Sequence, residues 1–158
     1  MFDTMIEAQG VGLAGPQVGK SLRLFVAMAD DDVRRTFINP QIIKTSETLC
    51  DYEEGCLSIP QVYETITRPD KFTVQALNEN GKPFTLEADG LLARIIQHEY
   101  DHLNGILYID RGDKDFAEKT TAQFAKRAER AAQKKAAKEA KDKKIAAKIA
   151  AKESKKNK

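Results

Sequence analysis

The segment at residues 97–102 reads Gln-His-Glu-Tyr-Asp-His and contains residue types that bind and use metal ions. On a helix, His98 and His102 are about one turn apart, so both imidazoles project from one face and can share a divalent cation. Glu99 points about 100° away from His98 around the helix axis, so it flanks such an ion and suits a general base. The alternative is a surface helix with two histidines placed together by chance. We favour the metal site, because the chain has only 2 histidines and an unpaired Glu99 in an apolar helix would be costly.

A catalytic metal site usually has three protein ligands, so a cysteine or a carboxylate is expected beside the two histidines. Cys56 stands between Gly55 and an apolar Leu-Ser-Ile stretch, whereas Cys50 lies in an ordinary polar stretch. A small buried apolar residue is the alternative for Cys56. Because the histidine pair is present in the same chain, we favour Cys56 as the third ligand. Two cysteines are too few for a disulfide framework, so we expect thiols or ligands.

Three sequence blocks resemble the signature motifs of a known enzyme family. Residues 10–17 read GVGLAGPQ, residues 54–58 read EGCLS and residues 97–102 read QHEYDH. In this order they resemble the three motifs of peptide deformylase. The intervening NENGKPFTLEADGLLA and HLNGILYIDR segments are similar too, so the resemblance covers residues 1 to about 115.

The resemblance implies a reaction and a metal. The reaction is hydrolysis of the formyl group from the N-terminal N-formylmethionine of newly synthesised proteins, with release of formate, in the bacterial cytoplasm. The implied ligands are Cys56, His98 and His102, around one Fe2+ per chain. Ni2+, Co2+ or Zn2+ can substitute for iron, because all of them accept this ligand set.

The same resemblance implies which groups act on the substrate. Glu99 is the general acid and base, and the Gln17 amide and the backbone N–H of Leu57 form the oxyanion hole. Losing one such preorganised donor typically costs about 3 kcal/mol. Arg68 and Glu54 also match family positions. The sequence allows two interpretations of this pair: an ion pair beside the metal ligands, or an ordinary surface salt bridge.

The methionine side chain of such a substrate needs an apolar slot. The glycine-rich loop and the helix turns before the first histidine are placed to line it, although core packing would select the same apolar residues. The residues predicted to contact substrate are Val11, Gly12, Gly55, Leu91 and Ile95.

Two features depart from the family pattern. The family usually has a strand and most of a helix before the position of Met1, and we expect this chain to lack them. A helix as short as residues 1–8 is marginal alone, so we expect fraying there to loosen the loop that carries Gln17. Gly15 stands where the first motif commonly has alanine, which adds flexibility to the same loop.

Both helices and strands are expected to position these residues. Phe2, Met5 and Ile6 lie on one face of the first short helix. We expect strands at 22–29 and 63–68 and extended pieces around Pro40. A hairpin is expected at 71–88, with a turn at Asn80-Gly81 that has positive φ angles. A helix is expected at 89–105, with Asp89 as its N-cap. Apolar residues cover most of that helix, so it should be buried. The pattern predicts an α+β fold of short antiparallel sheets packed around a central buried helix carrying His-Glu-x-x-His, with a C-terminal helix.

Charge divides the chain into an acidic body and a basic tail. Residues 116–158 contain 15 Lys or Arg and 5 Asp or Glu, whereas residues 1–115 contain 11 and 19. We predict a peptide-deformylase-like catalytic domain at 1–115 and a basic Lys/Ala-rich tail at 116–158 that is helical or disordered. The tail is a candidate for contact with the ribosome or its rRNA. No apolar run approaches about 20 residues, so we expect no membrane span, and we expect a monomer.

Three other functions fit parts of the sequence. Residues 10–15 spell the dinucleotide fingerprint G-x-G-x-x-G, but that motif needs a strand before it and a helix after it, the reverse of what is expected here. A zinc endopeptidase shares His-Glu-x-x-His and normally takes its third ligand from a downstream histidine or carboxylate. No histidine follows His102, and the nearby acids Asp110 and Asp113 lie in a turn signal. A nucleic-acid-binding protein acting through the tail would leave the chemical residues of the body without a role. Formate release from a formyl-Met peptide separates these readings.

Overall fold

The computed structural model describes residues 1–156, with side chains up to residue 143. It divides into one compact unit, Met1–Lys114, and a second that begins at Asp115. In chain order the first unit contains α1 (Phe2–Glu7), β1 (Gly12–Ala14), the 3-10 helix η1 (Gly15–Val18), β2 (Leu24–Ala27), β3 (Arg35–Thr45), β4 (Leu49–Cys56), β5 (Ile59–Pro69), β6 (Lys71–Leu77), β7 (Pro83–Asp89), α2 (Gly90–His102) and the 3-10 helix η2 (Tyr108–Arg111). Helix α3 (Lys114–Lys156) forms the second unit.

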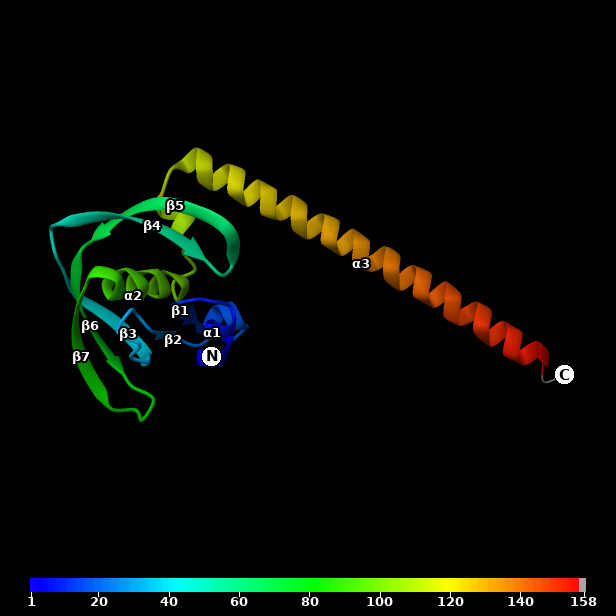
Figure 1. Ribbon diagram of the computed structural model, residues 1–158, viewed down its shortest axis with the longest axis horizontal. Helices are drawn as coiled ribbons and strands as arrows, with labels where there is room; N and C mark the ends of the chain where they lie inside the picture. The colour runs from blue at the N-terminus through cyan, green and yellow to red at the C-terminus, as the bar shows by residue number, and fades with distance from the viewer. Residues whose placement is uncertain (157–158) are drawn as a thin grey trace. The chain divides into compact units, whose positions relative to one another are not determined.

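A five-stranded antiparallel sheet, in the order β1-β2-β3-β6-β7, forms the larger layer of the first unit. Phe25, Phe37 and Val74 of this sheet are fully buried, in one cluster with Ile95 and Ile96 of α2. Each such buried side chain contributes roughly 1.5–3 kcal/mol to stability. The apolar face of α2 is therefore fixed against the sheet (Figure 1).

Strands β4 and β5 form a separate two-stranded sheet on the other side of α2 (Figure 1). Their pairing runs from Leu49↔Pro69 to Gly55↔Tyr63, and the register then shifts before Cys56. Polar bonds join this hairpin to α2. Arg94 of α2, for example, donates to the backbone oxygen of Ile66 in β5 at 2.9 Å.

Helix α2 closely follows its predicted limits. Asp89 occupies the N-cap position with an extended backbone, although its side chain makes no capping hydrogen bond. Gly105 follows the helix with a φ of 72°, in the left-handed region where glycine is favoured. Nine of the helix residues are buried, including His98, Glu99 and His102. The helix therefore carries its charged and polar groups in the interior of the first unit.

One strand lacks a sequence signal, and two sequence-based expectations differ from the structure. The polar stretch before Cys56 is strand β4, in which only Glu54 is buried, so it lacks the apolar alternation that marks a strand. Ile6 is 41% exposed, because the packed face of α1 is made by Met5 and its neighbours. In the β6–β7 hairpin Gly81 has a positive φ but Asn80 does not. The loop there is longer than a two-residue turn, with Asn78 N donating to the Lys82 backbone oxygen at 2.9 Å.

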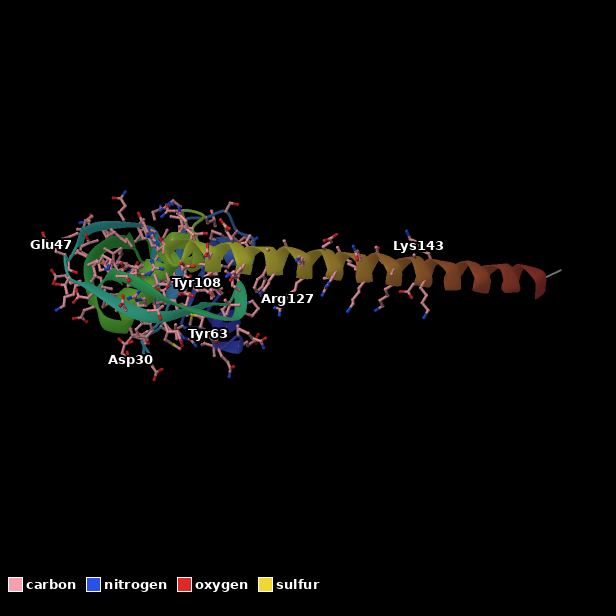
Figure 2. The ribbon with its side chains drawn as sticks, turned by 90° about the horizontal axis from the view of Figure 1, so that it is seen from above. Asp30, Glu47, Tyr63, Tyr108, Arg127 and Lys143 are labelled. Atoms are coloured by element: carbon pink, nitrogen blue, oxygen red, sulfur yellow. The ribbon has the colours of Figure 1, made fainter. Side chains whose placement is uncertain are left out.

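Helix α3 is continuous from Lys114 to Lys156. Every residue from 125 to 143 is exposed, and side chains such as Arg127 and Lys143 project from the ribbon in Figure 2. The described helices include none that is long and apolar enough to span a membrane. The predicted α+β class, with short antiparallel sheets, a central buried helix and a C-terminal helix, is confirmed.

Candidate active site

The three predicted metal ligands meet in the first unit. Cys56 ends strand β4, and His98 and His102 lie in the last turns of α2. One donor atom from each of the three residues lies within 4.8 Å of the other two. Cys56 Sγ is 3.2 Å from His102 Nε2. The helix supplies two donors on one face, and the β4–β5 hairpin supplies the third.

The donor set suits a divalent transition-metal ion. One thiolate and two imidazoles leave coordination positions open for a reactant, as catalytic centres require. Glu99 lies beside His98 in sequence and is 3% exposed, and its Oε2 has no hydrogen-bond partner among the described residues. Buried carboxylate oxygens normally have a partner. The unpartnered oxygen therefore indicates where a polar reactant can bind.

The electrostatic environment favours a thiolate beside a proton-carrying carboxyl group. Burial raises the pKa of the Cys56 thiol, but hydrogen bonds with His102 and His98 outweigh burial and lower the pKa to about 5. The thiolate is the form that binds metals. Burial raises the pKa of Glu99 to about 7, although the charges of His98 and His102 act to lower it. A carboxyl group with this pKa can both accept and donate a proton near neutrality.

His98 is oriented by a carboxylate on its far side. Its Nδ1 lies 2.9 Å from Glu54 Oε2. Burial raises the pKa of Glu54, but hydrogen bonds from His98 and Arg68 lower it to about 2, so Glu54 is ionised. A proton on Nδ1 donated to Glu54 leaves Nε2 with a free lone pair for a metal. Such carboxylate partners fix the ring orientation and raise the basicity of metal-binding histidines.

Glu54 belongs to a buried ion network. Arg68 donates from Nε to Glu54 Oε1 at 2.6 Å and from Nη2 to Oε2 at 2.9 Å. Its Nη1 donates to Asp101 Oδ2 of α2 at 2.6 Å, and Arg111 also binds Asp101. The Arg68 and Glu54 side chains are each 3% exposed. Of the two alternatives for this pair, the buried bond next to the metal ligands is the one present.

Gln17 presents its amide NH2 group to the same place. Its Oε1 accepts from the backbone N–H of Ala14 at 2.8 Å, so the amide is held by its oxygen. Its Nε2 donates to Ser58 Oγ at 3.1 Å and lies 3.6 Å from Cys56 Sγ. Leu57, the other residue predicted for the oxyanion hole, lies between Cys56 and Ser58. The 3-10 helix η1 therefore directs a neutral donor at the ligand cluster.

An open cleft of about 680 Å³ runs over these groups. All five residues predicted to contact substrate line it, and Cys56, His98, Glu99 and Gln17 also form part of its wall. A methyl group on Gly12 would overlap the Glu99 carboxylate. The predicted lining residues found in the cleft are Val11, Gly12, Gly55, Leu91 and Ile95.

Comparison with known proteins identifies the family. The chain matches the family model of polypeptide deformylase over residues 1–117. The chain belongs to the polypeptide deformylase family. The peptide deformylase of Treponema pallidum (strain Nichols) is 54% identical over 125 residues, which are 79% of this chain and 76% of that protein. That of Chromobacterium violaceum is 54% identical over 114 residues, 70% of this chain and 67% of that protein.

Solved structures of the family share the fold. A peptide deformylase from Legionella pneumophila has a TM-score of 0.74 and 42% identity, covering 84% of this chain and 79% of that one. A peptide deformylase from Synechococcus elongatus, in complex with actinonin, has a TM-score of 0.72 and 45% identity, covering 78% and 68%. As a member of this metal-dependent family, the chain is a hydrolase that removes the formyl group from an N-terminal formylmethionine.

The sequence analysis missed several residues around the site. Arg94 and Asp101 belong to the buried ion network, and Ser58 accepts the Gln17 amide. Tyr108 stacks on His98 with ring centroids 5.9 Å apart, and its hydroxyl donates to the Val62 backbone oxygen at 2.8 Å. A signal for Arg94 was present, because a charged residue four positions before His98 on an apolar helix requires a buried partner.

Proposed function

We propose that the cleft of this chain is the deformylase active site and that Cys56, His98 and His102 hold its metal ion. The supporting observation is the placement of an unpartnered buried oxygen, Glu99 Oε2, beside three converging metal-ligand side chains. A metal-binding cluster alone would fit a structural site. The additional proton-carrying group and the open cleft fit a hydrolase.

We propose Fe2+, one per chain, as the physiological ion, with Ni2+, Co2+ or Zn2+ as possible substitutes. The thiolate and two neutral imidazoles accept any of these ions, so the donor set does not select among them. When bound, the ion supplies a Lewis acid that polarises the formyl carbonyl and activates water for attack.

Glu99 is the proposed general acid and base. Its carboxylate takes a proton from the attacking water as the new bond to the formyl carbon forms. It then delivers this proton to the methionine nitrogen as the carbon–nitrogen bond breaks, and formate and a free amine are released. A buried carboxyl group whose pKa is about 7 suits both halves of this transfer.

Gln17 and Leu57 are the proposed donors to the developing oxyanion. The Gln17 amide is neutral, so it donates without competing for the metal. Its orientation is set before substrate binds, because Ala14 N–H holds the amide oxygen. Donors that need no reorganisation contribute most to stabilising the transition state.

The walls of the cleft are the proposed binding site for the methionine side chain. Leu91 and Ile95 supply apolar surface from α2, and Val11 supplies it from the loop before β1. Gly12 and Gly55 keep the backbone close to the reacting groups, and a methyl group at Gly55 would meet the Tyr63 ring.

We also propose the cellular setting. Residues 1–115 form the catalytic domain and act on nascent formyl-Met polypeptides in the bacterial cytoplasm, as a monomer. The basic tail at 116–158 is the proposed contact with the ribosome or its rRNA, because closely spaced Lys and Arg on an exposed helix suit a phosphate backbone.

The deciding experiment uses the full chain purified without oxygen, with metal content measured on the same sample. We expect formate release from a formyl-Met peptide, and its loss by at least 100-fold in Glu99→Gln at unchanged metal content. Glu87→Gln is the matched control, because Glu87 is exposed and does not line the cleft. Metal loss in Glu99→Gln, or cleavage of internal peptide bonds without formate release, would contradict the proposal.

A further inference from the structure

Arg94 is a buried cation on α2, one helical turn before His98. Its side chain is 5% exposed, although it lies on the helix that carries two of the three ligands. Its hydrogen-bond partners lie in the β4–β5 hairpin, which carries the third ligand. The residue therefore joins the two elements whose relative placement defines the metal centre.

The contacts of Arg94 reach both strands of the hairpin. Nη1 donates to Glu54 Oε1 at 2.8 Å and to the Ile66 backbone oxygen at 2.9 Å. Nη2 donates to the Cys50 backbone oxygen at 2.8 Å and lies 3.2 Å from its Sγ. The guanidinium also lies 5.6 Å from the centre of the Tyr52 ring. Because the donors of a guanidinium are rigid and planar, these acceptors are held at fixed positions relative to α2.

Two of the ligands depend on the groups that Arg94 holds. Glu54 lies two residues before Cys56 on β4, so fixing its carboxylate also fixes the end of that strand. The same carboxylate binds His98 through its other oxygen, Oε2. Arg68 also holds Glu54, but Arg68 belongs to the hairpin itself and contacts α2 through Asp101.

We propose that Arg94 is a positioning residue for the metal centre. It sets the β4–β5 hairpin against α2 and thereby fixes the Cys56 thiolate relative to the imidazole of His98. The inference rests on the proposed function only in requiring that the three ligands bind a metal. It adds a residue of the cleft wall whose side chain binds Glu54, the partner of His98, and so determines the geometry of the ligands.

The test measures Co2+ binding to the metal-free full chain, without oxygen and against a competing chelator. Arg94→Lys keeps the charge and removes the planar fork. We expect about 10- to 100-fold weaker Co2+ binding and a changed thiolate-to-cobalt absorption band, with a smaller effect on KM for a formyl-Met peptide. Arg94→Gln, which keeps an amide donor without the charge, is titrated in parallel in case the lysine variant does not fold.

Arg23→Lys is the matched control. Arg23 donates to the Leu103 backbone oxygen and to Asn104 Oδ1, both at 3.0 Å, so it holds the end of α2 without contacting the hairpin. We expect wild-type affinity and an unchanged absorption band for this variant. Unchanged affinity and absorption in the Arg94 variants, with only a lower thermal midpoint, would reduce Arg94 to a stabilising residue and overturn the inference. Absence of Co2+ binding in the wild-type chain would instead contradict the proposed metal site.

Discussion

Gly12 of strand β1 lies so close to Glu99 of α2 that a methyl group on Gly12 would overlap the Glu99 carboxylate. The absence of a side chain at position 12 therefore determines where this carboxylate can lie. Gly12 is not in the left-handed region of the backbone, so the requirement for glycine here is one of space.

We predict that Gly12→Ala lowers formate release by about 100-fold, because a displacement of about 1 Å at a reacting group has an effect of this size. Metal content should be unchanged, since Glu99 is not a ligand. Gly112→Ala is the control: a methyl group there would lie 3.1 Å from side-chain atoms of Glu64 and Ile66, outside the cleft. Wild-type turnover in Gly12→Ala would show that the Glu99 carboxylate can act from a second position.

The two cysteines should respond differently to substitution. Cys56→Ala removes a ligand atom, so we expect the loss of both metal and activity. In Cys50→Ala the backbone oxygen that binds Arg94 is retained, so metal content and turnover should stay near wild type. Metal analysis and a formyl-Met peptide assay on both variants provide the check. If only Cys50→Ala lost its metal, the thiolate ligand would be Cys50 and the assignment of Cys56 would be wrong.

The part of the site that lies on one helix was predictable from spacing. His98, Glu99 and His102 follow from helical geometry, and the limits of α2 follow from Asp89 and Gly105. These signals are local, because the residues concerned are neighbours along the helix. Helical spacing alone cannot connect Cys56 to the two histidines. Its place after Gly55 favoured it as the third ligand, and the resemblance to the deformylase motifs supported that choice.

The contacts between α2 and the hairpin were not predictable in the same way. Arg94 and the Glu54 carboxylate that it binds are 40 residues apart. Strand β4, which carries Glu54, exposes most of its side chains, so no apolar pattern marks it as a strand. A buried arginine signals that an acceptor exists, but the tertiary fold decides which carboxylate provides it.

Gln17 should contribute to the transition state without contributing to metal binding. We predict that Gln17→Ala lowers kcat by about 100- to 1,000-fold, the usual effect of removing one oxyanion donor. Metal content should be retained, because the amide lies 3.6 Å from Cys56 Sγ and is a donor rather than a ligand. Ser58→Ala is the comparison, since it removes one acceptor of the amide but leaves the bond to Ala14 N–H. A larger loss in Ser58→Ala than in Gln17→Ala would contradict the assigned role.

The buried and exposed ion pairs of the chain should differ sharply in their effect on stability. Arg68→Leu removes one cationic partner from the buried carboxylates of Glu54 and Asp101. Breaking such a buried pair lowers the free energy of unfolding by about 3–5 kcal/mol. Arg35→Leu breaks the pair with Asp31, whose side chain is 44% exposed, and exposed pairs are worth roughly 0.2–1 kcal/mol. Urea unfolding of both variants, without metal, gives the two losses directly. Comparable losses in the two variants would mean that water reaches Glu54 and that the network is less buried than its 3% exposure indicates.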